Sequence, residues 1–556
     1  MEIIPSFQNL LKTGFRFTGK NFANLFSRIG FFKPKLAPEK HLIIGTYGNP
    51  EIGKMLLEKN FIFGNVRLDV ETDTPWAIKP FSQEVERAIN GLEWLNDLSA
   101  INGQDAREIA ALWIDKLPYK KIRNDIMSAT YRLRSTSKNF LFLKTALNNE
   151  IEKKLYNIIK TDFLFIKILK PFIPDLFERL HITNSLIISS YIFDITENKK
   201  LHFAKSMYRD LKKYELKVEK GLIRNPQEIL DIYLMAIESQ TILSELKSNK
   251  IKENISLQRK TTDKLGAVIR FLQLNNGDLI SAHGGSVGRY QDFIINAPIN
   301  KNRGLAERKN FMGFEKLEGG RISILIDSAL PVYGKNIRNA HAGFSSFELS
   351  FGKEPIFVNC GGGSRFGREY RQYCQRSKAH NILIVNNKSQ CSFAKKLFWN
   401  KSSDYYIKSG PKNISIEKNK TLTTNSIELV HDAYTKDYGI IVGRKISIDL
   451  SGKMVQGVDY IETEDEKFKE QSQEYNLSVH FHLHPKTKFQ KKENELLIDL
   501  QSGHTLSFKT EGANLNLEDS THIDNFYEPH RTKKIILENL FKNCNGKINW
   551  YLTVLS

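Results

Sequence analysis

The spacing of apolar residues changes once along this chain, near residue 275, and that change constrains the fold more than any single motif. Before it, apolar residues recur three and four apart, as Val85 and Ile89 do after the candidate helix cap Ser82. After it, the turn signals NNGD and HGGSVG precede segments such as RISILID and YNLSVHFHLH, which are typical of strands. The pattern predicts helices first and antiparallel strands second.

The two periods divide the chain into parts with different expected structures. We predict a basic amphipathic segment over 1–40, an all-helical domain over 41–275, a linker over 276–310 and an antiparallel β-sandwich over 311–556. Within the helical part, HLIIGTYGNP and NFIFGNVRLDVE are expected to form short strands or extended entry segments. The fold class is therefore α+β with several domains, and a ligand site is expected in the cleft at the junction of the two halves.

Charge narrows the choice of partners. Lysine and arginine outnumber aspartate and glutamate by 82 to 62, which gives a net charge of +20. Such a surface attracts polyanions, whether acidic polysaccharide, nucleic acid or an anionic membrane. The alternative is a basic composition that spreads positive charge with no partner. The four cysteines have no paired spacing, so neither a disulfide framework nor a cysteine zinc site is indicated.

The first 40 residues combine an excess of lysine and arginine with apolar residues near helical spacing. They lack the apolar core and cleavage site of a signal peptide, and no part of the chain has the roughly 18 consecutive apolar residues of a membrane span. Two interpretations stay open. The segment lies on an anionic membrane surface, or it docks its apolar stripe on the next domain.

The most informative stretch is NAHAGFSSFEL at residues 339–349, which is followed by PIFVNCGGG and then by KAHN. We expect His341 to open a strand, Asn359 to end the next one and His380 to begin a third. Strand ends at glycine turns are places where a sheet can direct side chains toward one point. We expect His341 and His380 to converge on a metal ion or an acidic sugar. The alternative is that each is a hydrogen-bonded structural histidine.

Arginines and tyrosines alternate directly after the glycine turn. Guanidinium groups bind carboxylate or sulfate through paired hydrogen bonds, and tyrosine rings stack on sugars. The same composition suits single-stranded nucleic acid, but no nucleic-acid fold signature accompanies it, so we expect nucleic acid to be the less suitable partner. The predicted substrate-binding residues of this cluster are Arg365, Arg368, Arg371 and Tyr373, and Tyr370 among them is a catalytic candidate.

Further histidines fall in two other places. His283 lies in HGGSVG, where glycines let backbone amides approach a ligand, and we count it as a catalytic candidate; a simple turn between domains is the alternative. The segment lacks the ending of a phosphate-binding loop, which disfavours nucleotide binding. His480, His482 and His484 share one expected strand face, which is a spacing typical of metal ligands. No nearby carboxylate accompanies them, which disfavours a metal site there.

The stretch at 339–349, with the later Ala-His-Asn, resembles the C-terminal region of the heparinase II/III-like family. The family pattern is His-Ala-His-Ala-Asp, Ser-Phe-Glu-Leu, an Asp-Pro-Gly turn and Ala-His-Asn, and its order and spacing agree with this chain. Weaker likeness covers TPWAIKPFSQEVERAINGLEWLNDLSA, FMGFEKLEGGRISILID, HDAYTKDYG and FHLHP, and thus most of the sequence. The resemblance implies a helical (α/α) toroid followed by a β-sandwich.

The resemblance also implies a polysaccharide lyase that cleaves an acidic glycan of uronic acids, for example a glycosaminoglycan, by β-elimination in the cleft between toroid and sandwich. That reaction requires a group that neutralises the C6 carboxylate, a base for the C5 proton and an acid for the leaving oxygen. The catalytic candidates on this interpretation are His341, Asn339, Tyr370 and His283.

Two departures from the family pattern concern the histidine motif. Asn339 replaces the first histidine, and an amide hydrogen-bonds a carboxylate but is not a useful base. Asn359 replaces the aspartate of the zinc site found in some members, so zinc would rest on His341 and His380 with an amide as the third group. No other cofactor is indicated.

A third departure concerns the catalytic tyrosine of the helical half, which has no counterpart in GLIRNPQEILDIYL. Arg224 in this segment is expected to contact a substrate carboxylate, and Tyr233 is either packed in a helix or the general acid. Tyr290, Tyr370 and Tyr373 are the other tyrosines that would substitute.

These departures keep a second function open, in which the scaffold binds an acidic glycan but has lost the elimination chemistry. A glycoside hydrolase is disfavoured because no pair of carboxylates stands at glycine-flanked strand ends. The family resemblance implies the cell envelope or periplasm, whereas a cytoplasmic location follows if the missing signal peptide is decisive. The glycan itself is not specified by the sequence.

Overall fold

The computed structural model shows a chain that folds into two compact units, each described here by itself. One unit comprises Met1–Leu216 and Asp231–Leu265, and the other comprises Lys217–Leu230 and Gly266–Ser556. The structure describes residues 48–64, 66–70, 72–286, 310–334, 339–395, 405–463, 474–524, 528–542 and 544–555. The predicted amphipathic segment 1–40 lies outside the described residues. The second unit resumes at Gly266 and also includes the short segment 217–230.

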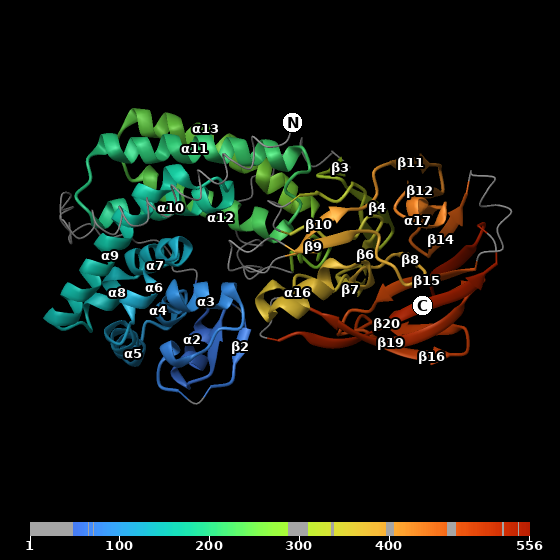
Figure 1. The fold of residues 1–556 in the computed structure, drawn as a ribbon, viewed down its shortest axis with the longest axis horizontal. Coiled ribbons are helices and arrows are strands. Elements are labelled where there is room, and N and C mark those ends of the chain that lie inside the picture. Colours follow the sequence, from blue (N-terminus) through green and yellow to red (C-terminus); the bar gives the residue numbers. More distant parts are fainter. Residues whose placement is uncertain are drawn as a thin grey trace. The chain divides into compact units, whose positions relative to one another are not determined.

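The first unit is built from helices, as the apolar spacing predicts (Figure 1). Ser82 caps its helix as expected, because its hydroxyl accepts a hydrogen bond of 3.1 Å from the Val85 amide. The strands expected in NFIFGNVRLDVE are β1 (Phe61–Phe63) and β2 (Val66–Leu68), which pair antiparallel. The helices are α2 (Pro50–Leu57), α3 (Gln83–Asn90), α4 (Trp94–Ile101), α5 (Gln104–Asp115), α6 (Tyr119–Ile122), α7 (Ile126–Lys138), α8 (Phe140–Lys144), α9 (Asn149–Leu169), α10 (Leu176–Ile192), α11 (Glu197–Glu219), α12 (Pro226–Ser244) and α13 (Asn249–Phe271).

A buried ion pair fastens α7 to α9 inside this unit. The Nε and Nη2 atoms of Arg132 donate hydrogen bonds of 2.7 and 2.8 Å to the two carboxylate oxygens of Asp162. Both side chains are almost completely buried, and the hydroxyl of Tyr119 donates to the same carboxylate over 3.0 Å. Two charges removed from water in this way are tolerated only because each satisfies the other.

The second unit is an antiparallel β structure with three sheets (Figure 1). The sheet orders are β11-β12-β13-β14-β21-β18-β17-β16, β19-β20-β15-β8 and β3-β4-β5-β6-β7. The strands are β3 (Asn310–Phe311), β4 (Phe314–Gly319), β5 (Ile322–Asp327), β6 (Phe347–Phe351), β7 (Glu354–Phe357), β8 (Leu383–Val385), β11 (Ile414–Lys420), β12 (Thr424–His431), β13 (Ile441–Asp449), β14 (Met454–Glu462), β15 (Tyr475–His482), β16 (Lys488–Lys492), β17 (Glu495–Asp499), β18 (Thr505–Glu511), β19 (Asn514–His522), β20 (His530–Phe541) and β21 (Lys547–Val554). A separate hairpin joins β9 (Ser392–Lys395) to β10 (Tyr405–Ser409).

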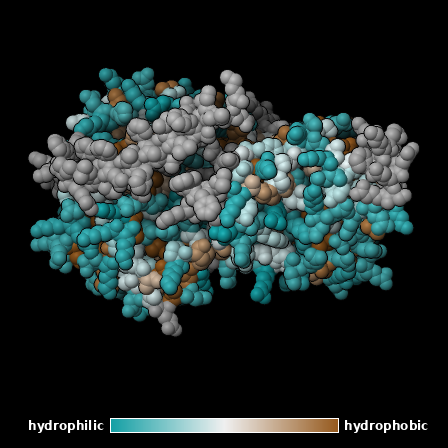
Figure 2. All heavy atoms as spheres, viewed as in Figure 1, coloured by the Kyte–Doolittle hydropathy of each residue, from teal (hydrophilic) through white to brown (hydrophobic). Residues whose placement is uncertain are grey.

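One hydrophobic core joins these sheets into a sandwich. Its apolar residues come from the eight-stranded sheet on one side and from the four- and five-stranded sheets on the other. Phe347 of β6 stacks on Trp550 of β21, with ring centroids 5.8 Å apart. Hydrophilic residues dominate the described surface in Figure 2, as expected when the apolar faces of the strands point inward. The predicted α+β class, with helices followed by an antiparallel sandwich, is confirmed.

Among the helices in the described part of the chain, none has both the length and the apolar character needed to cross a bilayer.

The buried ion pair between α7 and α9 gives a prediction about stability. Asp162→Ala leaves the Arg132 guanidinium buried without its carboxylate, which should lower the opening free energy of α7 and α9 by about 3–5 kcal/mol. Hydrogen exchange of peptides from these helices measures this. The control is Glu51→Ala, because Glu51 and its partner Lys54 are both largely exposed and should change that free energy by less than about 0.5 kcal/mol. Equal effects of the two variants would contradict a special role for the buried pair.

Candidate functional site

The chain that continues from β7 forms the centre of the candidate site. The Val358 amide donates to the carbonyl of His482, and the Cys360 amide donates to that of Ala379, over 2.9 and 3.0 Å. Gly361 then turns with φ +87°, and a Cβ there would lie 2.2 Å from the carbonyl oxygen of Ile523. Only glycine fits this turn, because both the backbone angle and the neighbouring carbonyl exclude a side chain.

The structure brings His341 and His380 together, as the sequence predicts. Their ring centroids are 5.4 Å apart, and both residues are buried. Neither residue lies in a strand: His341 precedes β6 in an irregular segment, and His380 follows a short 3-10 helix before β8. The expectation that each histidine begins a strand is therefore wrong, although the predicted convergence is confirmed. Gly343 leaves room for the pair, because a Cβ there would lie 3.3 Å from the His380 ring.

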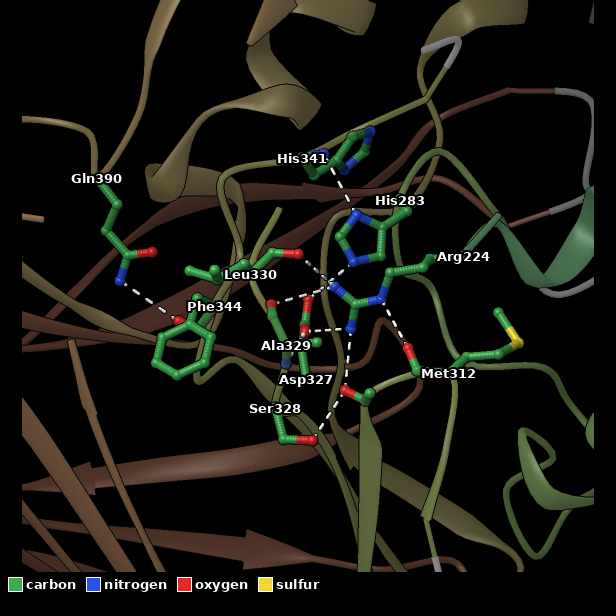
Figure 3. Close-up of polar contacts among 11 residues, drawn as sticks. Arg224, His283, Met312, Asp327, Ser328, Ala329, Leu330, His341, Phe344 and Gln390 are labelled. Atoms are coloured by element: carbon green, nitrogen blue, oxygen red, sulfur yellow. Dashed lines mark hydrogen bonds and ion pairs between the residues drawn. The ribbon is translucent and has the colours of Figure 1, made fainter. Parts of the chain in front are cut away.

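A third histidine joins the pair through a chain of polar contacts (Figure 3). The Nε2 atom of His283 lies 2.8 Å from Oδ2 of Asp327, and Oδ1 of Asp327 accepts a hydrogen bond of 2.5 Å from Arg224. On its other side, Nδ1 of His283 accepts a hydrogen bond of 3.3 Å from the backbone amide of His341. This pattern places the ring proton on Nε2 and uses the Nδ1 lone pair within the protein.

His283 is held in a strained backbone conformation, with φ +48°. Such an angle costs of order 1–3 kcal/mol for a residue other than glycine and persists only when the surroundings impose it. Here the surroundings are the Asp327 carboxylate and the His341 amide. The geometry therefore gives His283 a positioning role toward His341, and its predicted direct part in catalysis stays a prediction.

Arg224 is almost completely buried, and protein groups satisfy its guanidinium. It donates to the backbone carbonyls of Met312 and Gly313 over 2.8 and 2.9 Å, and to that of Ala329 over 3.1 Å, besides the Asp327 carboxylate. These contacts tie the segment before α12 to the ends of β4 and β5. They favour a structural role over the predicted contact of Arg224 with a substrate carboxylate, which no observation supports.

Burial keeps the three imidazoles uncharged at neutral pH. It lowers the pKa of His380 to about 4 and the pKa of His341 well below its usual range. The neighbouring rings of His380 and His283 also disfavour a positive charge on His341, and Arg371 lowers the pKa of His341 further. For His283, burial likewise lowers the pKa, even though Asp327 opposes the shift. A neutral imidazole carries a lone pair, which is what a base requires.

The donor set does not fit a zinc ion. Zinc sites in proteins use three or four ligands, and the pair offers only His341 and His380. The described residues contain no group of three His, Cys, Asp or Glu side chains that could hold a metal. The Oδ1 atom of Asn359, the third predicted ligand, already accepts a hydrogen bond of 3.2 Å from the Asn381 amide. No step of the chemistry proposed below involves a metal.

Sequence reasoning missed the buried carboxylic acid Glu348, which connects two backbone segments of the site. Its Oε1 atom accepts hydrogen bonds from the backbone amides of Ser281 and Asn359, over 3.1 and 2.8 Å. It thereby joins the segment that carries His283 to the segment that carries Asn359. A signal existed, because Glu348 is the single acidic residue in the apolar stretch FSSFELSF. Asp327 was missed as well, although it is likewise the single acidic residue of an apolar strand, ISILID.

The arginine and tyrosine cluster lies mostly on α16 (Arg368–Gln375) and the 3-10 turn before it. Tyr370 and Arg368 are exposed, whereas Arg365, Arg371 and Tyr373 are half-buried. Burial raises the pKa of the Tyr373 hydroxyl, which lies 3.9 Å from the thiol of Cys360. Among these residues, Arg371 is the one whose positive charge lowers the pKa of His341. The cluster and the histidines are therefore linked electrostatically.

The remaining candidates are placed as follows. Asn339 lies beside Gly284, where an added Cβ would come within 2.8 Å of the Asn339 side chain. Tyr233 is buried on α12, which favours packing over catalysis, and Tyr290 lies outside the described residues. In β15, Nδ1 of His482 lies 2.7 Å from the hydroxyl of Ser520 and is engaged inside the sandwich.

The fold and site define the class of this protein as a helical unit followed by an antiparallel sandwich, with a buried histidine cluster in the second unit. Residues 306–551 match the family model described as "Heparinase II/III-like, C-terminal". For this part of the chain, the match confirms the resemblance to the heparinase II/III-like family seen in the sequence.

Solved structures extend the likeness to the helical unit. The structure titled heparinase III matches with a TM-score of 0.68 at 10% identity, over 98% of this chain and 91% of that one. The heparan sulfate lyase HepC from Pedobacter heparinus matches with a TM-score of 0.54 at 12% identity, over 97% of this chain and 88% of that one. At these identities the likeness concerns the fold.

A curated relative is FtsZ-localized protein C of Caulobacter vibrioides (strain NA1000 / CB15N), which is 22% identical over 307 residues. The match covers 53% of this chain and 51% of that protein, so the chain spans about half the length of this relative.

Glu348 gives a prediction about pH. Burial raises its pKa from a usual value of 4.5 to about 8, so the folded state holds a proton that the unfolded state releases. The stabilising contribution is complete below pH 4.5 and is lost as the pH rises through about 8. Glu348→Gln keeps the hydrogen-bond acceptor without a titrating group. The variant should therefore lose less stability between pH 5 and 8 than wild type.

Hydrogen exchange of peptides from β5 and β6 at several pH values measures this difference, which should be a few kcal/mol at most, since each pKa unit corresponds to about 1.4 kcal/mol. The control is Glu318→Gln, because Glu318 lies on the neighbouring strand β4 and is mostly exposed. If wild type and Glu348→Gln lose stability in parallel, the buried carboxyl group is not protonated in the folded state.

Proposed function

We propose that this protein binds an acidic polysaccharide containing uronic acids and cleaves it by β-elimination. The observation that carries the proposal is the buried pair of uncharged imidazoles, His341 and His380, in a heparinase II/III-like domain. The arginines of α16 support it, because Arg371 brings positive charge to the same place. The +20 net charge of the chain suits a polyanionic substrate.

Each requirement of the reaction has a candidate among these residues. The guanidinium of Arg371 and the amide of Asn339 would bind the C6 carboxylate and so acidify the C5 proton. The neutral imidazole of His341 would accept that proton as the C4–O bond breaks and the C4=C5 double bond forms. The hydroxyl of Tyr370, which is exposed on α16, would donate a proton to the departing oxygen.

A second candidate function is binding without cleavage, and Asn339 favours it. This residue stands where the family pattern has a histidine, and an amide accepts no proton at useful pH. Glycan binding would survive such a change, because the arginines and tyrosines of α16 are independent of it. Of the two functions, cleavage is our first proposal because His341 retains an uncharged ring beside Arg371.

We further propose that the glycan belongs to the cell envelope. The family resemblance supports this location. Residues 1–40, with their basic and apolar composition, are our proposed contact with an anionic membrane surface.

The first test is ultraviolet absorbance during incubation with a panel of uronic-acid polysaccharides. β-Elimination creates a conjugated C4=C5 double bond, which hydrolysis does not. We expect absorbance to rise with wild type and the rate to fall at least about 100-fold with His341→Ala, the size of a general-base contribution. Binding of the glycans with no absorbance change would favour the binding protein instead. No binding and no cleavage across the panel would contradict both functions for those glycans.

The second test separates a specific site from general charge. Arg371→Glu reverses the charge beside His341 and should reduce retention on an immobilised acidic polysaccharide. The matched control is Lys353→Glu, which makes the same change at an exposed turn of the same unit. Equal losses in the two variants would mean that only net charge matters, and would contradict the assignment of α16 as the glycan-binding element.

A further inference from the structure

The histidine pair has unused hydrogen-bonding capacity in a buried place. Nδ1 of His341 lacks a hydrogen-bond partner, and neither ring nitrogen of His380 has a well-aligned one. The carbonyl of Cys374 is the group that acts on the His380 ring most directly, and it is not positioned for a full hydrogen bond. Unsatisfied buried nitrogens are uncommon in folded proteins, because each costs roughly 1–3 kcal/mol. They mark a place where a further group can be bound.

Asn359 stands directly beside this pair. Its Oδ1 atom accepts from the amide of Asn381, the residue after His380, and the next amide along the chain, that of Cys360, donates to Ala379, the residue before His380. Residues 359–360 and 379–381 are thus neighbouring segments. The Asn359 side chain is completely buried, and its amide interacts with the Glu348 carboxyl group, although Nδ2 has no well-aligned hydrogen bond. An amide nitrogen cannot bind a metal ion as a carboxylate oxygen does.

Aspartate has the same shape as asparagine and differs at this one atom. An aspartate at position 359 would keep the oxygen that accepts from Asn381 and would replace the unsatisfied Nδ2 with a second, charged oxygen. Two imidazoles and one carboxylate form a common zinc set, with a fourth position left for water or substrate. Asn359 is therefore the position at which this chain departs from such a set.

We propose that the His341–His380 pair functions without zinc in this protein, and that Asn359 is the single residue that prevents zinc from binding. The proposal does not depend on whether the protein cleaves or only binds a glycan. The two imidazoles stay available for proton transfer and hydrogen bonding, and the positive charge that a metal would bring comes from arginine side chains instead.

The experiment measures zinc in the full chain, purified after expression with added zinc and dialysed without chelator. We expect wild type to hold far less than one zinc per chain. Asn359→Asp should hold close to one and bind zinc at least roughly 100-fold more tightly, as expected when a ligand set is completed. His380→Ala in the Asn359→Asp background should remove it. The matched control is Asn386→Asp, which makes the same charge change in the loop after β8 and should leave zinc content at the wild-type level.

Folding of each variant is checked by circular dichroism and thermal unfolding, in which bound zinc should raise the Tm of Asn359→Asp alone. If Asn359→Asp fails to fold, Asn359→Cys provides a ligand that is uncharged until zinc binds. One zinc per wild-type chain that His380→Ala removes would overturn the proposal. A folded Asn359→Asp protein with no more zinc than wild type, or with zinc that survives His380→Ala, would overturn it equally.

Discussion

The contact between Arg224 and Asp327 is the interaction on which the rest of the site depends. A buried guanidinium and a buried carboxylate satisfy each other, and the remaining donors of the arginine hold three backbone carbonyls at the ends of β4 and β5. The free oxygen of Asp327 then fixes His283, and His283 receives the backbone amide of His341. Removing either charged side chain would leave the other buried without a partner, at a large cost in stability. This cost holds the two side chains in fixed positions.

Rigidity here has a chemical consequence, because the protein holds three imidazoles uncharged at close range. Burial is the largest cause for each ring and neighbouring positive charge a smaller one, and Asp327, which contacts His283, opposes the lowering of the pKa for both His283 and His380. The histidine with the carboxylate partner has its second nitrogen occupied by the His341 amide, whereas the two without such a partner keep unused nitrogens. Within the cluster, His283 therefore has a positioning role, whereas His341 and His380 keep the nitrogens that are available to react.

The sequence could predict what depends on local pattern. The change of apolar period predicted the order of helices and strands, and local residue signals predicted the Ser82 cap, the short strands at β1 and β2 and the meeting of His341 with His380. It could not predict what depends on partners distant in the chain. Arg224 looked like a ligand for a substrate carboxylate because its own partner, Asp327, lies 103 residues away. The role of Glu348 could not be predicted because its hydrogen-bond donors are backbone amides, which leave no pattern in the sequence.

Asn339 and Asn359 each place a neutral amide where the family pattern has a group that can carry charge. Each keeps a hydrogen-bonding side chain where the family pattern has a group that gains a proton or binds a metal, so the centre of the site is neutral. On the proposed function, the positive charge that a uronic acid needs comes from Arg371 of α16, whose charge acts on His341. A neutral centre combined with this basic side chain would then bind the carboxylate without a metal ion that holds it tightly. We propose that the arrangement suits a long polymer whose charged units enter and leave the site in turn.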